Sequence, residues 1–162
     1  MAVNLKWCCQ KKEGIRLIEL NENLAKGYIS MAEAAIGTMN REKRFNMQFA
    51  ISACYYSMYY SLYAVLMKLG IKCEIHACTL EFIKQILPAF YSDEDIKIIY
   101  RAFNVRNTSQ YYVDRIVARE DIDFIISNAP YFLGKSKEIL AKINEKDINK
   151  IRSEIEELFA KW

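Results

Sequence analysis

Apolar residues recur every three or four positions along most of the chain, which is the spacing of one face of an α-helix. The pattern predicts a first helix over residues 23–39 and a long second helix over residues 41–69. The second helix should end at Gly70, because glycine is the commonest residue just after a helix C-terminus. A third helix is expected over residues 76–87, where Pro88 closes it.

The second half of the chain continues the helical pattern. The residues Ser-Asp-Glu-Asp at 92–95 have the form of a capping box and predict a fourth helix that runs to about Val117. A fifth helix is expected over residues 121–143, kinked or interrupted at Pro130, and a final amphipathic helix over residues 147–160. No segment forms a convincing strand. The sequence therefore predicts an all-α fold, an antiparallel up-and-down bundle of five to six helices.

A single domain is expected, because 162 residues suffice for one hydrophobic core and hardly for two. Residues 1–20 lack a clean periodicity and are expected to form an N-terminal extension that packs on the domain. Residues 21–145 would form the bundle itself, and residues 146–162 would add a C-terminal amphipathic helix.

Composition narrows the class of protein. A hydrophobic fraction of 52% and a charged fraction of 27% are globular values and exclude a disordered chain. The net charge of +3 comes from 23 basic and 20 acidic residues. That balance does not identify a nucleic-acid binder by charge alone, although a sequence pI of about 8.5 permits an acidic ligand.

The stretch from Phe45 to Met67 has no charged residue and is long enough to span a bilayer. Its five tyrosines, however, are spread along its middle, whereas tyrosines of membrane helices collect at the two interfaces. The stretch is better explained as the central helix of a bundle, so no membrane contact is expected. The N-terminus lacks the apolar run of a secretory signal, and the five cysteines are expected to be reduced thiols in the cytoplasm.

The predicted fourth helix has an arginine in its apolar face. That face consists of Ile99, Phe103, Val113 and Val117. Arg106 and Gln110 fall inside it, and Asn107 and Tyr111 lie along its edge. A charge buried without partners costs several kcal/mol, so two interpretations stay open. Arg106 is either a buried residue satisfied by carbonyls, tyrosine hydroxyls or a carboxylate, or it faces a groove or second subunit and binds phosphate.

The predicted second helix offers partners for Arg106. One of its faces carries Phe45, Ser52, Tyr55, Tyr56, Tyr59, Tyr63 and Leu66. The ordinary interpretation is core packing with hydroxyls at the rim. The alternative is that one or two hydroxyls, with Tyr55 and Tyr56 as candidates, line a pocket around Arg106.

These segments resemble the HEPN domain family. The stretch AISACYYSMYYSLYAVLMKLGIKCEIHACTLEFI (residues 50–83) is similar to the family's tyrosine-rich helix followed by glycine, a loop and a histidine that opens the next helix. RNTSQYY (residues 106–112) resembles the family motif on the following long helix, and residues 14–36 are similar to archaeal members. The resemblance covers roughly residues 14–135, and the two motifs together are fairly specific.

The resemblance implies a four- to five-helix bundle that forms a homodimer. In active members, an arginine and a histidine one turn later meet their symmetry mates and form a metal-independent ribonuclease site. Such proteins are often paired with a minimal nucleotidyltransferase in toxin–antitoxin systems, which makes a small nucleotidyltransferase a candidate partner.

Carried over by residue, Arg106 matches the motif arginine, Asn107 matches the polar residue after it, and Tyr111 stands where the histidine would be. The ordinary pKa of tyrosine is near 10, against about 6.5 for histidine, so Tyr111 is a poor general base at neutral pH. It can still donate a hydrogen bond to a phosphate. Binding of a nucleotide or RNA therefore remains expected, whereas ribonuclease activity is an open question.

His76 is the only histidine of the chain. It is either a capping or core residue, or it lies near Arg106 and replaces the missing motif histidine as a third catalytic candidate beside Arg106 and Tyr111. A zinc site built on Cys73, His76 and Cys78 would need a fourth ligand, and no second cysteine pair has the required spacing. No metal and no cofactor are expected, since the nucleotide-binding and hydrolase motifs are missing as well.

Two functional hypotheses follow. The first is a HEPN nucleotide- or RNA-binding protein, the toxin-like partner of a nucleotidyltransferase, with weak or lost ribonuclease activity. The second is a purely structural or protein-interaction bundle without a ligand, in which Arg106 is a satisfied core residue.

Overall fold

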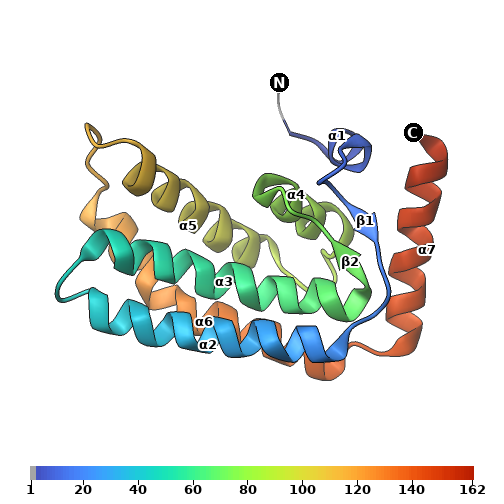
Figure 1. Cartoon of the computed structure of the whole chain (residues 1–162), viewed down its shortest axis with the longest axis horizontal. Coiled ribbons are helices and arrows are strands. Elements are labelled where there is room, and N and C mark those ends of the chain that lie inside the picture. Colours follow the sequence, from blue (N-terminus) through green and yellow to red (C-terminus); the bar gives the residue numbers. More distant parts are fainter. Residues whose placement is uncertain (1–2) are drawn as a thin grey trace.

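The computed structural model describes residues 3–162, and within that range it has seven helices and two short strands (Figure 1). The helices are α1 (Leu5–Gln10), α2 (Glu22–Glu42), α3 (Met47–Leu69), α4 (His76–Ile86), α5 (Asp93–Tyr111), α6 (Arg119–Lys142) and α7 (Glu145–Lys161). The strands β1 (Arg16–Leu17) and β2 (Ile71–Lys72) pair antiparallel. The predicted all-α bundle is confirmed. The two strands were not predicted, because a strand of two residues is too short to show an alternating pattern.

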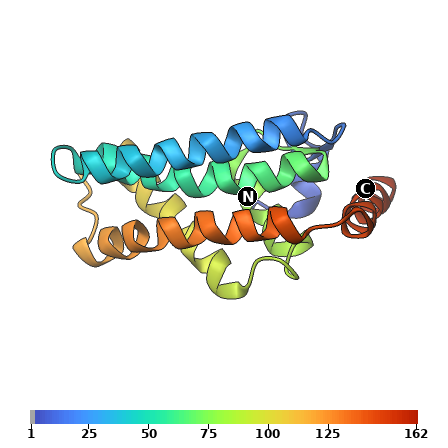
Figure 2. The same cartoon turned by 90° about the horizontal axis from the view of Figure 1, so that it is seen from below.

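Helix α3 lies at the centre of the bundle. Of its 23 residues 16 are buried, since α2, α5 and α6 pack around it. Figure 2 shows the axes of α2, α3 and α6 running alongside one another, with α7 turned away at the far end. Within the described residues, no helix has the length and apolarity needed to cross a bilayer. The uncharged stretch is therefore a central helix.

The ends of α3 are fixed by specific contacts. Asn46 caps its first turn by accepting a hydrogen bond from the backbone N–H of Phe49. Gly70 ends the helix in the left-handed conformation at φ 68°, as expected from the sequence. One nitrogen of Arg152 in α7 donates to the carbonyls of Ile18, Leu69 and Gly70, which ties α7 and β1 to this end of α3.

Three helix boundaries differ from prediction. Helix α3 begins at Met47 and not at residue 41, because a turn before the Asn46 cap separates it from α2. Helix α5 ends at Tyr111 and not near Val117, because Val113 finds nothing to pack against and is fully exposed. Helix α6 runs from Arg119 without interruption through Pro130.

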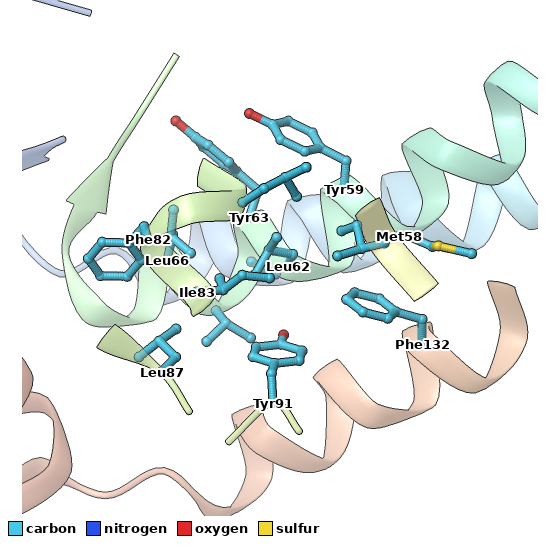
Figure 3. Packing of buried hydrophobic residues seen from close by; sticks show 14 of the residues in the cluster. Met58, Tyr59, Leu62, Tyr63, Leu66, Phe82, Ile83, Leu87, Tyr91 and Phe132 are labelled. Atoms are coloured by element: carbon cyan, nitrogen blue, oxygen red, sulfur yellow. The ribbon is translucent and has the colours of Figure 1, made fainter. Parts of the chain in front are cut away.

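The hydrophobic core forms where α3 meets α4, α6 and the segment between α4 and α5 (Figure 3). Tyr91 stacks on Phe132, and its hydroxyl bonds to the buried hydroxyl of Ser136 at 2.9 Å. In the same view the hydroxyl ends of Tyr59 and Tyr63 point away from these core residues. Tyrosines of α3 thus cover a second face of the helix, where polar partners meet them.

The N-terminal segment is joined covalently to the bundle. Cys8 of α1 and Cys78 of α4 form a disulfide, with Cα atoms 5.5 Å apart. The expectation that all five cysteines are reduced is therefore wrong for this pair, because the fold brings α1 against the first turn of α4. Cys9, Cys54 and Cys73 are free thiols.

Candidate functional site

Arg106 lies on the side of α5 that faces α3 and is only 7% exposed. Its Nη2 donates to the hydroxyl of Tyr56 at 2.7 Å, and its Nη1 donates to the side-chain oxygen of Asn107 at 2.8 Å. Its Nε is buried without a hydrogen-bond partner. Among residues 3–162, no carboxylate lies within ion-pair distance of the guanidinium. Its positive charge is thus nearly buried and held only by neutral groups.

Aromatic rings surround the guanidinium. Its central carbon lies 5.3 Å from the ring centres of both Tyr55 and Tyr56, and 5.7 Å from that of Tyr111. The faces of aromatic rings carry partial negative charge and attract a cation at this range. The rings therefore stabilise Arg106, although they do not neutralise it.

His76 is the first residue of α4 and belongs to the same cluster. Its Nδ1 lies 2.7 Å from the hydroxyl of Tyr55, and the tautomer of the imidazole decides which atom donates. The ring stacks on Tyr59 with centroids 4.0 Å apart and planes 5° from parallel. Tyr55 thus contacts both the histidine and Arg106.

The surroundings keep His76 and Tyr55 neutral. Burial, assisted by the positive charge of Arg106, lowers the pKa of His76 from 6.5 to about 4. Burial raises the pKa of the Tyr55 hydroxyl well above its ordinary value of 10. At neutral pH the cluster therefore has one cation, Arg106, beside a neutral imidazole and neutral hydroxyls.

The structure brings together five of the residues chosen from the sequence, which are Arg106, Asn107, Tyr55, Tyr56 and His76. The sixth, Tyr111, keeps its ring near the guanidinium but is 61% exposed at the end of α5.

The prediction that the apolar face of the fourth helix is buried is wrong at its C-terminal end, where Gln110 and Val113 are exposed. The stack of His76 on Tyr59 was missed as a feature of the site. The tyrosine spacing along α3 carried that signal, because it placed Tyr59 one turn beyond Tyr55.

In the part of the chain that the structure describes, no three His, Cys, Asp or Glu side chains are grouped to hold a metal ion. The zinc alternative also loses a ligand, since the sulfur of Cys78 is bonded to Cys8. What the cluster offers is a guanidinium with free N–H groups, hydroxyl donors and a neutral imidazole, a set suited to an anion.

The protein is thus an all-α bundle whose central helix is lined with tyrosines and faces a nearly buried arginine. A profile of the HEPN domain matches residues 25–140, which is most of the chain. The chain is also 30% identical over 98 residues, 59% of its length and 67% of the relative's, to a Methanocaldococcus jannaschii protein described as a candidate toxin. The chain belongs to the HEPN domain family.

Proposed function

We propose that this HEPN protein binds a nucleotide or RNA through a phosphate group held by Arg106. The observation that carries the proposal is a guanidinium that is 7% exposed and has only neutral partners. A buried charge is costly when no opposite charge compensates it. A bound phosphate supplies that charge and accepts charge-assisted hydrogen bonds.

The guanidinium retains donors for such a ligand. Arginine has five N–H groups, of which those facing Tyr56 and Asn107 are engaged. These two bonds hold the plane of the group, so little conformational freedom is lost when an anion binds. The exposed Tyr111 beside it can stack on a base or donate to the phosphate.

Cleavage of RNA is weak or lost in this proposal. Tyr111 occupies the position of the motif histidine and is a poor base at neutral pH. His76 is in the unprotonated form that a base requires, but a pKa of about 4 makes it a weak one. We therefore expect this chain to bind RNA or a nucleotide but to cleave RNA weakly or not at all.

A homodimer is part of the proposal, with α3 and α5 contributing to the interface. Large apolar side chains remain exposed where these helices end: Phe45, Phe49, Val113 and Ile116. The α2–α3 turn with the first turn of α3, and the α5–α6 loop, carry these side chains and lie at the same end of the bundle in both views (Figures 1 and 2). Large apolar side chains exposed near one another are typical of a surface that a partner covers.

The relative's description as a candidate toxin supports a toxin-like role. The proposal also includes a cytoplasmic location and a small nucleotidyltransferase as antitoxin partner, which rest on the family resemblance alone. Residues 21–145 would be the HEPN unit, residues 1–20 an extension packed on it, and residues 146–162 an added helix. The competing candidate is a structural or interaction bundle without a ligand. Its support is that Nη1 and Nη2 of Arg106 already have hydrogen-bond partners in Asn107 and Tyr56.

Asn107→Asp separates the two candidates. The substitution keeps the shape of the side chain and places a carboxylate where the amide oxygen accepts from Arg106 at 2.8 Å. That carboxylate would compete with phosphate for the guanidinium. The affinity for a fluorescent single-stranded RNA should fall about tenfold or more, a loss of about 1.4 kcal/mol, while the melting temperature is kept or raised.

Asn104→Asp is the matched control, because Asn104 is exposed on the same helix and the change in net charge is identical. Its RNA affinity should fall only slightly, and more at low salt than at high salt. Wild-type protein that binds neither RNA nor nucleotides would refute the proposal and favour the structural bundle.

A further inference from the structure

The Cys8–Cys78 disulfide lies beside the candidate site. Cys78 is two residues after His76 in the first turn of α4, and both sulfurs belong to fully buried residues. The turn that leads away from α1 is built around this link. The N–H of Ile15 donates to the carbonyl of Cys8, and a side chain at Gly14 would collide with that carbonyl, at 1.8 Å from its oxygen.

Apart from the contacts of the His76 ring with tyrosines of α3, the first turn of α4 has weak polar support. Its N-cap, Ile75, makes no side-chain capping bond, so the first N–H groups of the helix lack that support. The hydroxyl of Thr79 reaches the carbonyls of Cys73 and Ile75 only at 3.4 Å. The disulfide therefore adds a covalent restraint on this turn to the contacts that the His76 ring makes with Tyr55 and Tyr59.

We propose that the Cys8–Cys78 disulfide is a redox-sensitive clamp that holds His76 in place, and that its reduction loosens the first turn of α4. This effect on His76 does not depend on the function proposed above. A dithiol reductant supplies two electrons and two protons, so that the S–S bond becomes two thiols and the reductant becomes a cyclic disulfide. A small-molecule disulfide such as oxidised glutathione reverses the step and leaves as two thiols.

The neighbouring thiols are poorly suited to attack this bond. Cys9 is half-buried and follows Cys8 in the sequence. Cys73 is buried and lies close to Cys9. Burial raises the pKa of both thiols, and Cys73 adds to the shift at Cys9. Because only a thiolate attacks a disulfide, neither thiol exchanges readily at neutral pH. Because both sulfurs are buried, an external reductant would reach the bond only through local opening of α1, a short helix of six residues.

His76 reports on the clamp without interference, because the chain has no other histidine. Its imidazole is faced by Tyr55, Tyr56 and Tyr59 of α3 and by Arg106 of α5. These groups hold its pKa low through burial and the arginine's charge. A turn that moves away from α3 would restore water to the ring and move the pKa back towards 6.5.

The experiment begins with the full chain, which is treated with oxidised glutathione, freed of the reagent and then unfolded. Three thiols should react, those of Cys9, Cys54 and Cys73, and five should react after treatment with a dithiol. NMR of the imidazole then follows the folded protein in both states. Reduction should shift its signals and raise the pKa of His76 by about one pH unit or more, a change as large as the usual spread among folded proteins.

Cys8→Ser should reproduce the reduced spectrum without any reductant, whereas Cys9→Ser, which removes the adjacent free thiol, should behave as wild type. Five reactive thiols after oxidation would overturn the proposal. Imidazole signals that are identical in the oxidised, reduced and Cys8→Ser proteins would overturn it as well. A His76 response in protein that binds no RNA in either state would support the clamp and refute the proposed function.

Discussion

Replacing Arg106 by methionine should weaken ligand binding by about 30-fold or more at little cost to folding. The two hydrogen bonds of the guanidinium stabilise the fold by about 1.5–3 kcal/mol each, and its contacts with tyrosine rings add about 0.5–2 kcal/mol. Burying its uncompensated charge costs several kcal/mol, which offsets most of that gain. Methionine is similar in length and has no charge, so the free energy of unfolding should change by less than about 2 kcal/mol.

Ligand affinity should respond far more strongly. Removing one member of a buried, hydrogen-bonded charge pair costs about 2–5 kcal/mol, which is about 30-fold or more in the dissociation constant. Thermal unfolding should show a shift of no more than about 8 °C for a chain of this size. Titration of labelled single-stranded RNA by fluorescence anisotropy measures the affinity of the same samples.

Arg101→Met is the matched control for this substitution. Arg101 is on the same helix, pairs with Asp121 at 2.7 Å and lies over the ring of Phe124. Its loss should weaken folding modestly and leave RNA affinity within about threefold of wild type, under 1 kcal/mol. If Arg106→Met unfolds the protein and no ligand protects the wild type, Arg106 is a core residue and the reasoning is refuted.

Three further predictions concern stability, cleavage and assembly. Because the folded pKa of His76 is lowered from 6.5 to about 4, only the unfolded chain takes up a proton between these values. The melting temperature should therefore fall as pH drops from 6.5 towards 4, and His76→Gln should flatten this dependence. Purified protein should cleave little or no RNA near neutral pH. Any cleavage should disappear in His76→Ala with the dimer intact, whereas Tyr111→His should increase it. Brisk cleavage that persists in His76→Ala would contradict this mechanism. Sedimentation should show a homodimer at micromolar concentration, and a monomer there would contradict the proposed interface.

The bundle could be predicted because its signals are local. The capping box at Ser92 and the glycine at position 70 act within one turn of the helix ends that they define. The end of α5 could not be predicted in this way. Val113 keeps the helical spacing, but spacing does not reveal whether a second element covers the residue, and none does.

Most contacts between segments far apart in the sequence could not be predicted. Cys8 and Cys78 are 70 positions apart in the sequence, and nothing between them indicates that α1 packs against α4. Tyr55, Tyr56 and Arg106, by contrast, could be placed together, because helical spacing and the family motif agree on their positions. The stack of His76 on Tyr59 depends on the rotation of α4 against α3, which no local pattern fixes.

The most direct test of the phosphate site is an NMR titration of the His76 imidazole with a 5′-phosphorylated RNA oligomer. A phosphate bound to Arg106 offsets the positive charge that helps to lower the pKa of His76. The imidazole signals should therefore move saturably and the pKa should rise above about 4, with burial still holding it below 6.5, while RNA produces neither change in Arg106→Met. Signals that stay in place up to millimolar RNA, with wild-type and Arg106→Met proteins indistinguishable, would contradict a phosphate site at Arg106.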